Sequence, residues 1–421
     1  METDQLYLFR EKRFLPLFIT QFGSCLGDNL LKSALIIFVT YVLAGQRGYD
    51  AGQMILLANA ILIFPFLLFS GIGGQLADKY EKKHVIVVVK FVEMFFAFLG
   101  IYGFHHENIF IMYTALFLMG SHAAFFGPVK FSILPETLKK EELLSANGYI
   151  EAGTFVGILI GTLLGGLYNF YPSIVISIMI FVVVGSFIAA LFIPKIGNSQ
   201  PSMKLDYNIF RESTEIVKNA ASKRQVFLSI LGISWFWFIG AAFLSEIPIL
   251  SKEIFCTNEH VANLFLAIFS IGVGVGSFWC NKIYENEITS KYVPISALIL
   301  SVFVVDLYFA CGNLAPKHCS GELLGLFDFL SYVNNVRVMF DLFFISAISG
   351  LYAVPLYATM QYFSAPSHRS RVIAANNIMN ALFMIGSSLL LSLLFFFKLS
   401  VPTVILILGI MNAIVALKIY K

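Results

Sequence analysis

The sequence predicts an all-α membrane protein with twelve transmembrane helices, arranged as two similar bundles of six. Hydrophobic residues make up 58% of its 421 residues and charged residues only 13%, whereas soluble domains have about 45–50% and about 25%. Long apolar stretches recur along the chain, each near the ~20 residues that a helix needs to cross ~30 Å of hydrocarbon. These stretches are too long for barrel strands, and a helix satisfies its own backbone hydrogen bonds within a bilayer.

The apolar stretches place each span and divide the chain. The predicted spans are 14–44, 51–77, 84–103, 108–134, 143–170, 172–194, 225–250, 260–283, 291–312, 338–364, 370–397 and 400–419. We expect an N-terminal six-helix bundle at 1–194, a polar linker at 195–224 with a surface helix at 206–220, and a C-terminal bundle at 225–421. A second polar insert, 313–337, lies on the opposite side, where Cys311 and Cys319 could pair if that side is oxidising.

The distribution of basic residues predicts the orientation. With the amino terminus in the cytoplasm, 20 of the 28 Lys and Arg residues lie in cytoplasmic segments, 5 on the other side and 3 within spans. Short loops rich in Lys and Arg stay in the cytoplasm. We therefore expect both termini to be cytoplasmic.

The two halves resemble each other at a fixed offset. Ala146-Asn147-Gly148 and Ala375-Asn376-Asn377 open the fifth and eleventh spans, 229 residues apart, and Gly157 matches Gly386 at the same offset. Parallel six-helix repeats occur in transporters that bind substrate near the membrane midplane between the halves.

The loop between the second and third spans reads Gly74-Gln75-Leu76-Ala77-Asp78-Lys79 and continues to Lys82-Lys83. It resembles the signature loop of the major facilitator superfamily, although Glu81 stands where the family has glycine. We expect Gly74, Asp78, Lys82 and Lys83 to act in gating, with Gly74 allowing a close helix approach and Asp78 facing a helix end or a basic group as a latch. The alternative is a plain basic loop on the cytoplasmic side.

Four segments resemble the bacterial lysophospholipid transporters of that superfamily, which occur free or as the membrane part of fused phospholipid-recycling proteins. They are Gln21-Phe22 with Gly27-Asp28-Asn29; Gly127-Pro128-Val129-Lys130-Phe131; Ala146-Asn147-Gly148 with Glu151, Gly161 and Gly165; and Val354-Pro355-Leu356 with Gln361. In span seven, Glu246 stands where free members often carry a basic residue.

Ionisable residues within spans are the candidate functional residues, because a charge at the bilayer centre costs at least ~2.5–3.5 kcal/mol. Asp28 and Lys32 share one face of the first span, so they either bind substrate or form a structural ion pair. Lys130 either binds substrate or reaches to the interface. The residues expected to bind substrate are Asp28, Asn29, Lys32, Lys130, Asn147, Glu151, Gln361, Asn376 and Asn380.

Two other sets of polar residues are expected to be structural. Glu93 and Lys90, three residues apart in the third span, favour an ion pair. His122 is more simply explained as a hydrogen-bonded core histidine than as a proton relay. No catalytic residues, metal site or cofactor are expected.

The resemblance implies a flippase that moves lysophospholipids, such as lysophosphatidylethanolamine and lysophosphatidylglycerol, across the bacterial inner membrane for reacylation. A separate acyltransferase/acyl-carrier-protein synthetase would then be its partner, with membrane lipids around a monomer and no nucleic acid bound. The alternative is a proton-coupled drug or metabolite carrier that uses Asp28 or Glu93. We do not expect a membrane enzyme, because the sequence shows no nucleophile–base pair or acyltransferase box.

Overall fold

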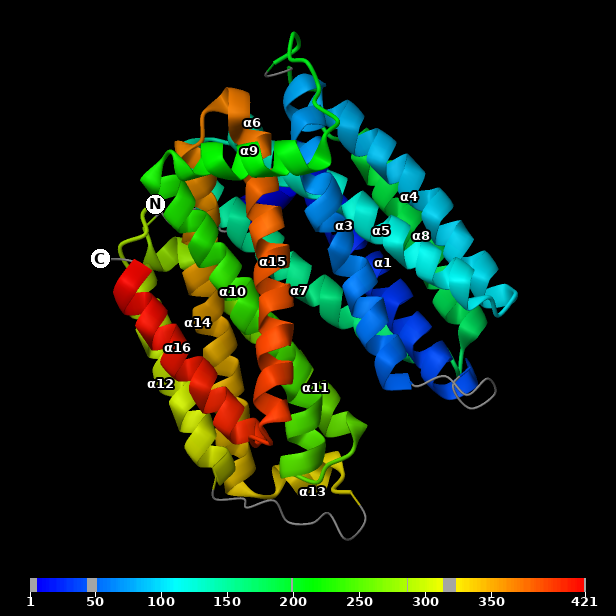
Figure 1. The fold of residues 1–421 in the computed structure, drawn as a ribbon, viewed down its shortest axis with the longest axis vertical. Coiled ribbons are helices and arrows are strands. Elements are labelled where there is room, and N and C mark those ends of the chain that lie inside the picture. Colours follow the sequence, from blue (N-terminus) through cyan, green and yellow to red (C-terminus); the bar gives the residue numbers. More distant parts are fainter. Residues whose placement is uncertain (1–5, 44–50, 198–199, 286, 313–322, 420–421) are drawn as a thin grey trace. The chain divides into compact units, whose positions relative to one another are not determined.

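A computed structural model describes residues 6–43, 51–197, 200–285, 287–312 and 323–419 (Figure 1). Its long helices are α1 (Leu15–Phe38), α3 (Ala51–Lys79), α4 (Lys82–His105), α5 (Ile109–Ser132), α7 (Leu143–Gly166), α8 (Pro172–Leu191), α10 (Arg224–Ile249), α11 (Glu259–Ile283), α12 (Val293–Gly312), α14 (Val333–Phe363), α15 (Arg369–Phe396) and α16 (Val401–Ile419). No described residue belongs to a β-strand. The predicted all-α membrane fold is confirmed.

Eleven of the described helices are long and apolar enough to cross a membrane. Helix α1 has the length of a twelfth span, since its 24 residues reach about 36 Å at 1.5 Å per residue. A short π-helix, Val39–Leu43, continues α1 and accounts for most of its predicted length. Most predicted ends lie within a few residues of the observed ones, because the apolar stretches themselves mark the helices.

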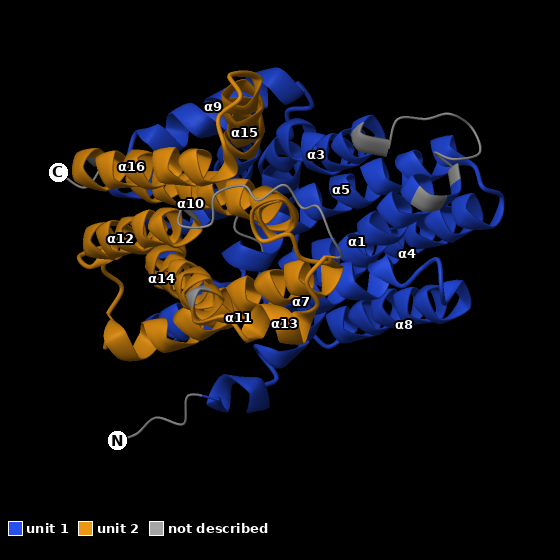
Figure 2. Ribbon diagram, turned by 90° about the horizontal axis from the view of Figure 1, so that it is seen from below, with its two compact units in different colours: residues 1–146, 153–227, 360–381 blue, residues 147–152, 228–359, 382–421 orange. Residues whose placement is uncertain are grey.

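The structure divides into two compact units that interleave in the sequence (Figure 2). Unit 1 holds residues 1–146, 153–227 and 360–381, and unit 2 holds residues 147–152, 228–359 and 382–421. The first part of α15 thus groups with unit 1, although it comes late in the sequence. The division into 1–194, 195–224 and 225–421 stays a prediction.

The core of unit 1 lies where α1, α5 and α8 meet. Leu30, Leu31 and Leu116 are almost fully buried in it. Helix α7 approaches α1 closely through glycines: a Cβ atom at Gly161 would lie 2.4 Å from the Leu26 carbonyl oxygen, and one at Gly165 would lie 2.5 Å from the Leu30 oxygen. Small residues spaced by four allow such approaches between membrane helices.

Unit 2 uses the same device between α11 and α14. A Cβ atom at Gly276 would lie 1.8 Å from the Ala347 carbonyl oxygen, and one at Gly350 would lie 2.6 Å from the Ser277 nitrogen. Unit 2 also contains a buried pair of polar side chains, in which the Trp235 indole donates to the Asn412 side chain at 2.8 Å.

The two polar segments differ in how well they were predicted. The linker contains α9 (Ile209–Ala221), close to the surface helix expected at 206–220, and α9 packs against α3. The insert 313–337 includes a short helix, α13 (Leu326–Leu330), and the start of α14. Cys311 is a buried free thiol, so its suggested pairing with Cys319 is wrong; Cys319 lies outside the described residues.

Candidate functional site

Asp78 ends α3 in direct contact with the start of α15. Its side chain is fully buried. Oδ1 accepts a hydrogen bond from the Ser370 backbone nitrogen at 3.0 Å, and Oδ2 lies 3.0 Å from Nε of Arg371. A carboxylate at a helix N-terminus is stabilised by the unpaired N–H groups and the positive end of the helix dipole. Asp78 therefore has both a helix end and a basic group as neighbours.

Gly74 lies one turn before Asp78, where α3 and α15 are closest. A Cβ atom at Gly74 would lie 2.8 Å from Cβ of Ala374 and 3.0 Å from Cα of Arg371. Any larger residue would push the helices apart and pull Asp78 away from its contacts. The contacts of Asp78 therefore depend on the close helix approach that Gly74 allows.

Lys82, at the start of α4, supplies a second buried ion pair at the same end of the helices. Its side chain is fully buried, and Nζ lies 2.9 Å from Oε1 of Glu136. The same oxygen lies 3.8 Å from Nη1 of Arg369. Lys83, which is half-buried, forms no ion pair with any residue in the described part of the chain.

We call these residues the α3–α15 junction: Gly74, Asp78, Lys82, Glu136, Arg369, Ser370 and Arg371. Of these, Glu136 and Ser370 were not singled out from the sequence, and Arg369 and Arg371 entered only the count of basic residues. Sequence patterns of neighbouring residues could not reveal these contacts. Ser370, for example, contacts a residue that lies 292 positions earlier in the chain.

A second polar group lies within the spans of unit 1, and we call Asp28, Lys90, Glu93 and His122 the mid-span cluster. Nζ of Lys90 lies 2.5 Å from Oε2 of Glu93 and also donates to the Ser24 hydroxyl. Nε2 of His122 lies 3.3 Å from the same Glu93 oxygen. One ligand atom each from Asp28, Glu93 and His122 lie within 4.8 Å of one another. Three helices, α1, α4 and α5, thus bring these residues together.

Several atoms of this cluster are buried without a hydrogen-bond partner. They are Oδ1 of Asp28, Oε1 of Glu93 and both ring nitrogens of His122. Buried polar atoms nearly always have a partner. These atoms of the cluster could therefore bind a proton, an ion or a polar ligand.

The structure tests the interpretations of these residues. The Lys90–Glu93 ion pair is confirmed. His122 is buried as expected, and its Nε2 lies 3.3 Å from a Glu93 oxygen. Asp28 and Lys32 form no ion pair with each other, so that alternative is also wrong. Instead Asp28 interacts electrostatically with Glu93 and with three lysines: Lys32, Lys90 and Lys130.

The remaining substrate-binding candidates are distributed over both units. The Asn29 side chain donates to the Cys25 carbonyl oxygen of its own helix at 2.8 Å. The Lys130 ammonium lies 4.9 Å from the centre of the Phe131 ring, within reach of a cation–π interaction. Asn147 and Glu151 are buried and belong to unit 2.

The amides near the start of α15 are in unit 1. Gln361 and Asn376 are fully buried. Both side-chain amide atoms of Asn376 lack a hydrogen-bond partner. At Gln361 the backbone carbonyl oxygen accepts a hydrogen bond from Nε of Arg369 at 3.0 Å. Asn380 is half-buried. The orphaned amide of Asn376 offers both a donor and an acceptor.

The mid-span cluster is also the place where a metal ion would fit by residue type. Asp28, Glu93 and His122 could each supply one ligand. However, the Lys90 ammonium already lies 2.5 Å from Glu93, and a divalent ion would have to approach or displace that positive charge. The donor set therefore suits a metal poorly.

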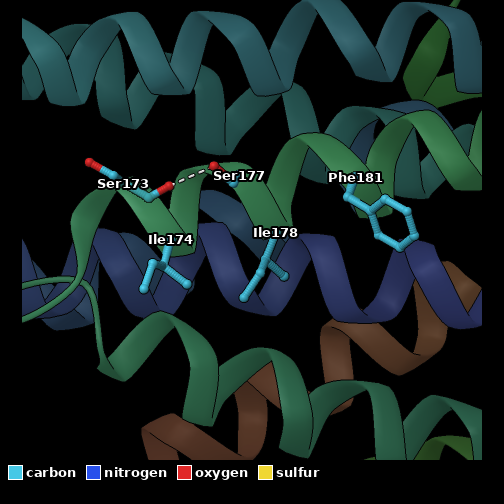
Figure 3. A pocket seen from close by; sticks show the side chains of 5 residues that line it. All are labelled: Ser173, Ile174, Ser177, Ile178 and Phe181. Atoms are coloured by element: carbon cyan, nitrogen blue, oxygen red, sulfur yellow. Dashed lines mark hydrogen bonds between the residues drawn. The ribbon is translucent and has the colours of Figure 1, made fainter.

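A shallow pocket of about 370 Å³ lies on α8, and none of the residues above lines it. Ser173, Ile174, Ser177, Ile178 and Phe181 line it (Figure 3). The Ser177 hydroxyl donates to the Ser173 carbonyl oxygen of the same helix. No ionisable group lines this pocket, so it offers no charged partner to a headgroup.

Comparisons with known proteins agree with the motifs. Residues 17–316 match the family model described as Major Facilitator Superfamily. A relative named lysophospholipid transporter LplT, from Citrobacter koseri, is 26% identical over 359 residues, which cover 83% of this chain and 80% of the relative. A protein of the same name from Serratia proteamaculans is 26% identical over 367 residues, covering 86% and 82%. The resemblance drawn from the sequence is confirmed.

Solved structures share the fold at low identity. The Escherichia coli fucose:proton symporter FucP has a TM-score of 0.69 and 14% identity, with 97% of both chains covered. The human organic anion transporter TETRAN has a TM-score of 0.73 and 10% identity, with 99% of this chain and all of the other covered. With the family model spanning most of its length and its helices matching these folds, the chain is a multi-pass membrane protein that belongs to the major facilitator superfamily.

Proposed function

We propose that this chain is a lysophospholipid transporter of the bacterial inner membrane. It moves lysophospholipids, such as lysophosphatidylethanolamine and lysophosphatidylglycerol, across the bilayer for reacylation by alternating access. Similarity over more than four fifths of the chain to proteins named lysophospholipid transporter supports this substrate class.

The observation that carries the proposal is the mixture of charges around Asp28. Its half-buried carboxylate has an unpartnered oxygen, roughly 20 Å along α1 from Leu15 at 1.5 Å per residue. Lys32, Lys90 and Lys130 interact with it electrostatically. A lysophosphatidylethanolamine headgroup carries an ammonium that a carboxylate attracts and a phosphate that lysines attract. The acyl chain needs only the apolar walls that the spans supply.

The other residues are assigned roles on the same grounds. Asn29, Asn147, Glu151, Gln361, Asn376 and Asn380 join Asp28, Lys32 and Lys130 in binding the headgroup. In the α3–α15 junction, Gly74, Asp78 and Lys82, with Lys83 beside them, hold a gate that opens during each cycle. Both termini are cytoplasmic, the protein acts as a monomer, and a separate acyltransferase/acyl-carrier-protein synthetase consumes the lysolipid.

Transfer of labelled lysophosphatidylethanolamine between the leaflets of proteoliposomes tests this function. Wild-type protein is expected to accelerate transfer, and Asp28→Ala and Lys130→Ala each to reduce the rate at least tenfold while eluting normally on size exclusion. The matched control is Asn59→Ala, a polar residue of α3 whose side chain bonds only within its own helix. Absence of lysolipid transfer by the wild type would refute the proposal, and wild-type rates in both variants would remove the site.

A carrier of a soluble metabolite or drug is the second candidate, because Asp28, Glu93 and His122 form a protonatable group within the spans. The same proteoliposomes decide between the two. A carrier of this kind would take up a soluble solute under an imposed pH gradient and leave lysolipid in its leaflet.

A further inference from the structure

Phe126 on α5 is a buried aromatic residue that the headgroup site proposed above does not use. It is 2% exposed. Nζ of Lys90 lies 4.9 Å from the centre of its ring, and Nζ of Lys130 lies 6.0 Å from the same centre. The imidazole of His122 is nearly parallel to the ring, with the two centres 6.1 Å apart. One phenyl ring thus contacts a lysine of the mid-span cluster and a lysine of the proposed headgroup site.

This ring can attract both ammonium groups at once. The face of an aromatic ring carries a partial negative charge and attracts a cation within about 6 Å of its centre, most strongly where water is absent. Both lysines belong to predicted spans, where an ammonium group is costly to bury. A phenyl ring carries no net charge of its own. It therefore stabilises the two ammonium groups without neutralising either of them.

The two lysines differ in their other contacts. Nζ of Lys90 lies 2.5 Å from Oε2 of Glu93, so a carboxylate balances the charge of this ammonium. Nζ of Lys130 lies 4.9 Å from the centre of a second ring, that of Phe131. Lys90 therefore contacts Phe126 from α4 as part of an ion pair. Lys130 is contacted by aromatic residues that precede and follow it on α5.

The spacing of these residues on α5 affects where the Lys130 ammonium lies. Phe126 and Lys130 are four residues apart, so their side chains share one face of the helix. Lys130 is half-buried, and the long stem of such a lysine readily carries its ammonium to the membrane interface. The attraction of the two rings favours a position beside the helix instead. A phosphate that enters the bundle then meets a positive charge that is already in place.

We propose that Phe126 is a positioning residue, whose ring holds the Lys130 ammonium by a cation–π interaction where a lysolipid phosphate can bind it. A phosphate carries a full negative charge, so it replaces the weaker attraction of the ring when it arrives. A leucine would fill much of the same space but would not attract either lysine. The role of Phe126 toward the phosphate rests on the proposed function, whereas its attraction of the two lysines does not.

The attraction of the lysines to Phe126 is tested without any lysolipid. Fluorinated phenylalanines keep the shape of the ring and withdraw electrons from its face, so each added fluorine weakens the attraction for a cation. Phenylalanine with one, two or three fluorines is incorporated at position 126 of the full-length protein, and thermal unfolding is followed in nanodiscs. The unfolding temperature is expected to fall stepwise with the number of fluorines. A temperature that does not follow this number overturns the proposal.

Phe125 provides the matched control, because its ring stacks on that of Phe69 with the centres 5.9 Å apart. The same series at position 125 should show no stepwise fall, and an equal fall at both positions would indicate a packing effect and overturn the proposal. In the Lys130→Met background, the fall at position 126 should be smaller, because one of the two cations is gone. A fall of the same size in that background would show that the ring does not hold Lys130.

Positioning for the phosphate is tested by the affinities for lysophosphatidylethanolamine and lysophosphatidylglycerol, which both carry a phosphate. Three fluorines at position 126 are expected to weaken both affinities about tenfold, whereas three fluorines at position 125 should leave them unchanged. A stepwise fall in unfolding temperature with unchanged affinities at position 126 refutes the positioning role. The same fall in a protein whose wild type binds no lysolipid refutes the proposed function and leaves the attraction of the lysines to Phe126 intact.

Discussion

Lys90 makes the Glu93 carboxylate stable within α4. Both side chains are fully buried and lie 2.5 Å apart. Removing one partner of a buried ion pair typically costs about 3–5 kcal/mol, whereas replacing both with apolar residues is often neutral. We therefore expect that removing Lys90 alone destabilises the fold, because the Glu93 carboxylate would remain buried and charged.

We expect Lys90→Met to lower the unfolding temperature of the purified protein markedly, because Glu93 is then buried beside His122 without its cation. The double variant Lys90→Met/Glu93→Met should recover most of the loss. Thermal unfolding followed by tryptophan fluorescence measures both. Equal stability of Lys90→Met and the wild type would show that the pair contributes nothing at this position.

Asp28 shows why the sequence predicted the residues of a site but not their pairing. Helical spacing put Asp28 and Lys32 on one face, which made a local ion pair reasonable. In the structure, Lys90 and Glu93 pair within α4 instead, while Asp28 interacts with groups from α4 and α5. Only the packing of three helices decides between these partners. The twelve spans, by contrast, follow from local hydropathy alone, so their positions could be predicted.

At the scale of helices, glycines determine how closely α7 approaches α1. We expect Gly161→Leu to prevent correct folding, because even its Cβ atom would lie 2.4 Å from the Leu26 carbonyl oxygen. Gly166→Leu is the matched control on the same helix, since nothing lies within 4 Å of a Cβ atom there. The yield of monodisperse protein on size exclusion measures both. Similar yields of the two variants would show that correct folding does not require the close contact between α1 and α7.

The α3–α15 junction is a second contact between helices that can be tested as a unit. Asp78→Asn weakens both the bond to the Ser370 nitrogen and the ion pair with Arg371, and Arg371→Ala removes the ion pair from the other side. We expect each to reduce lysolipid transfer, and the double variant to be no worse than Asp78→Asn. Residues in direct contact show such coupling, of about 0.5–3 kcal/mol. Additive losses would mean that the two residues act separately.

Lys82 and Arg369 extend this junction in a way that the loop motif did not predict. Both contact Glu136 on α6 (Leu134–Thr137), so a carboxylate from a four-residue helix connects the starts of α4 and α15. The motif placed Lys82 in a basic loop, where an exposed lysine was an equally simple outcome. Its complete burial depends on Glu136, and neither residue indicates the other in the sequence.

At the scale of the whole molecule, the orientation remains to be measured. The basic residues favour a cytoplasmic linker by 20 to 5, and short loops follow this bias. Two exposed positions report on opposite sides: Lys218 on α9 in the linker, and Glu259 at the start of α11. We expect a membrane-impermeant maleimide applied to intact spheroplasts to label Glu259→Cys and to label Lys218→Cys only after permeabilisation. The wild-type chain gives the background from its own cysteines, and labelling with the reverse pattern would invert the topology and place the α3–α15 junction on the outer side.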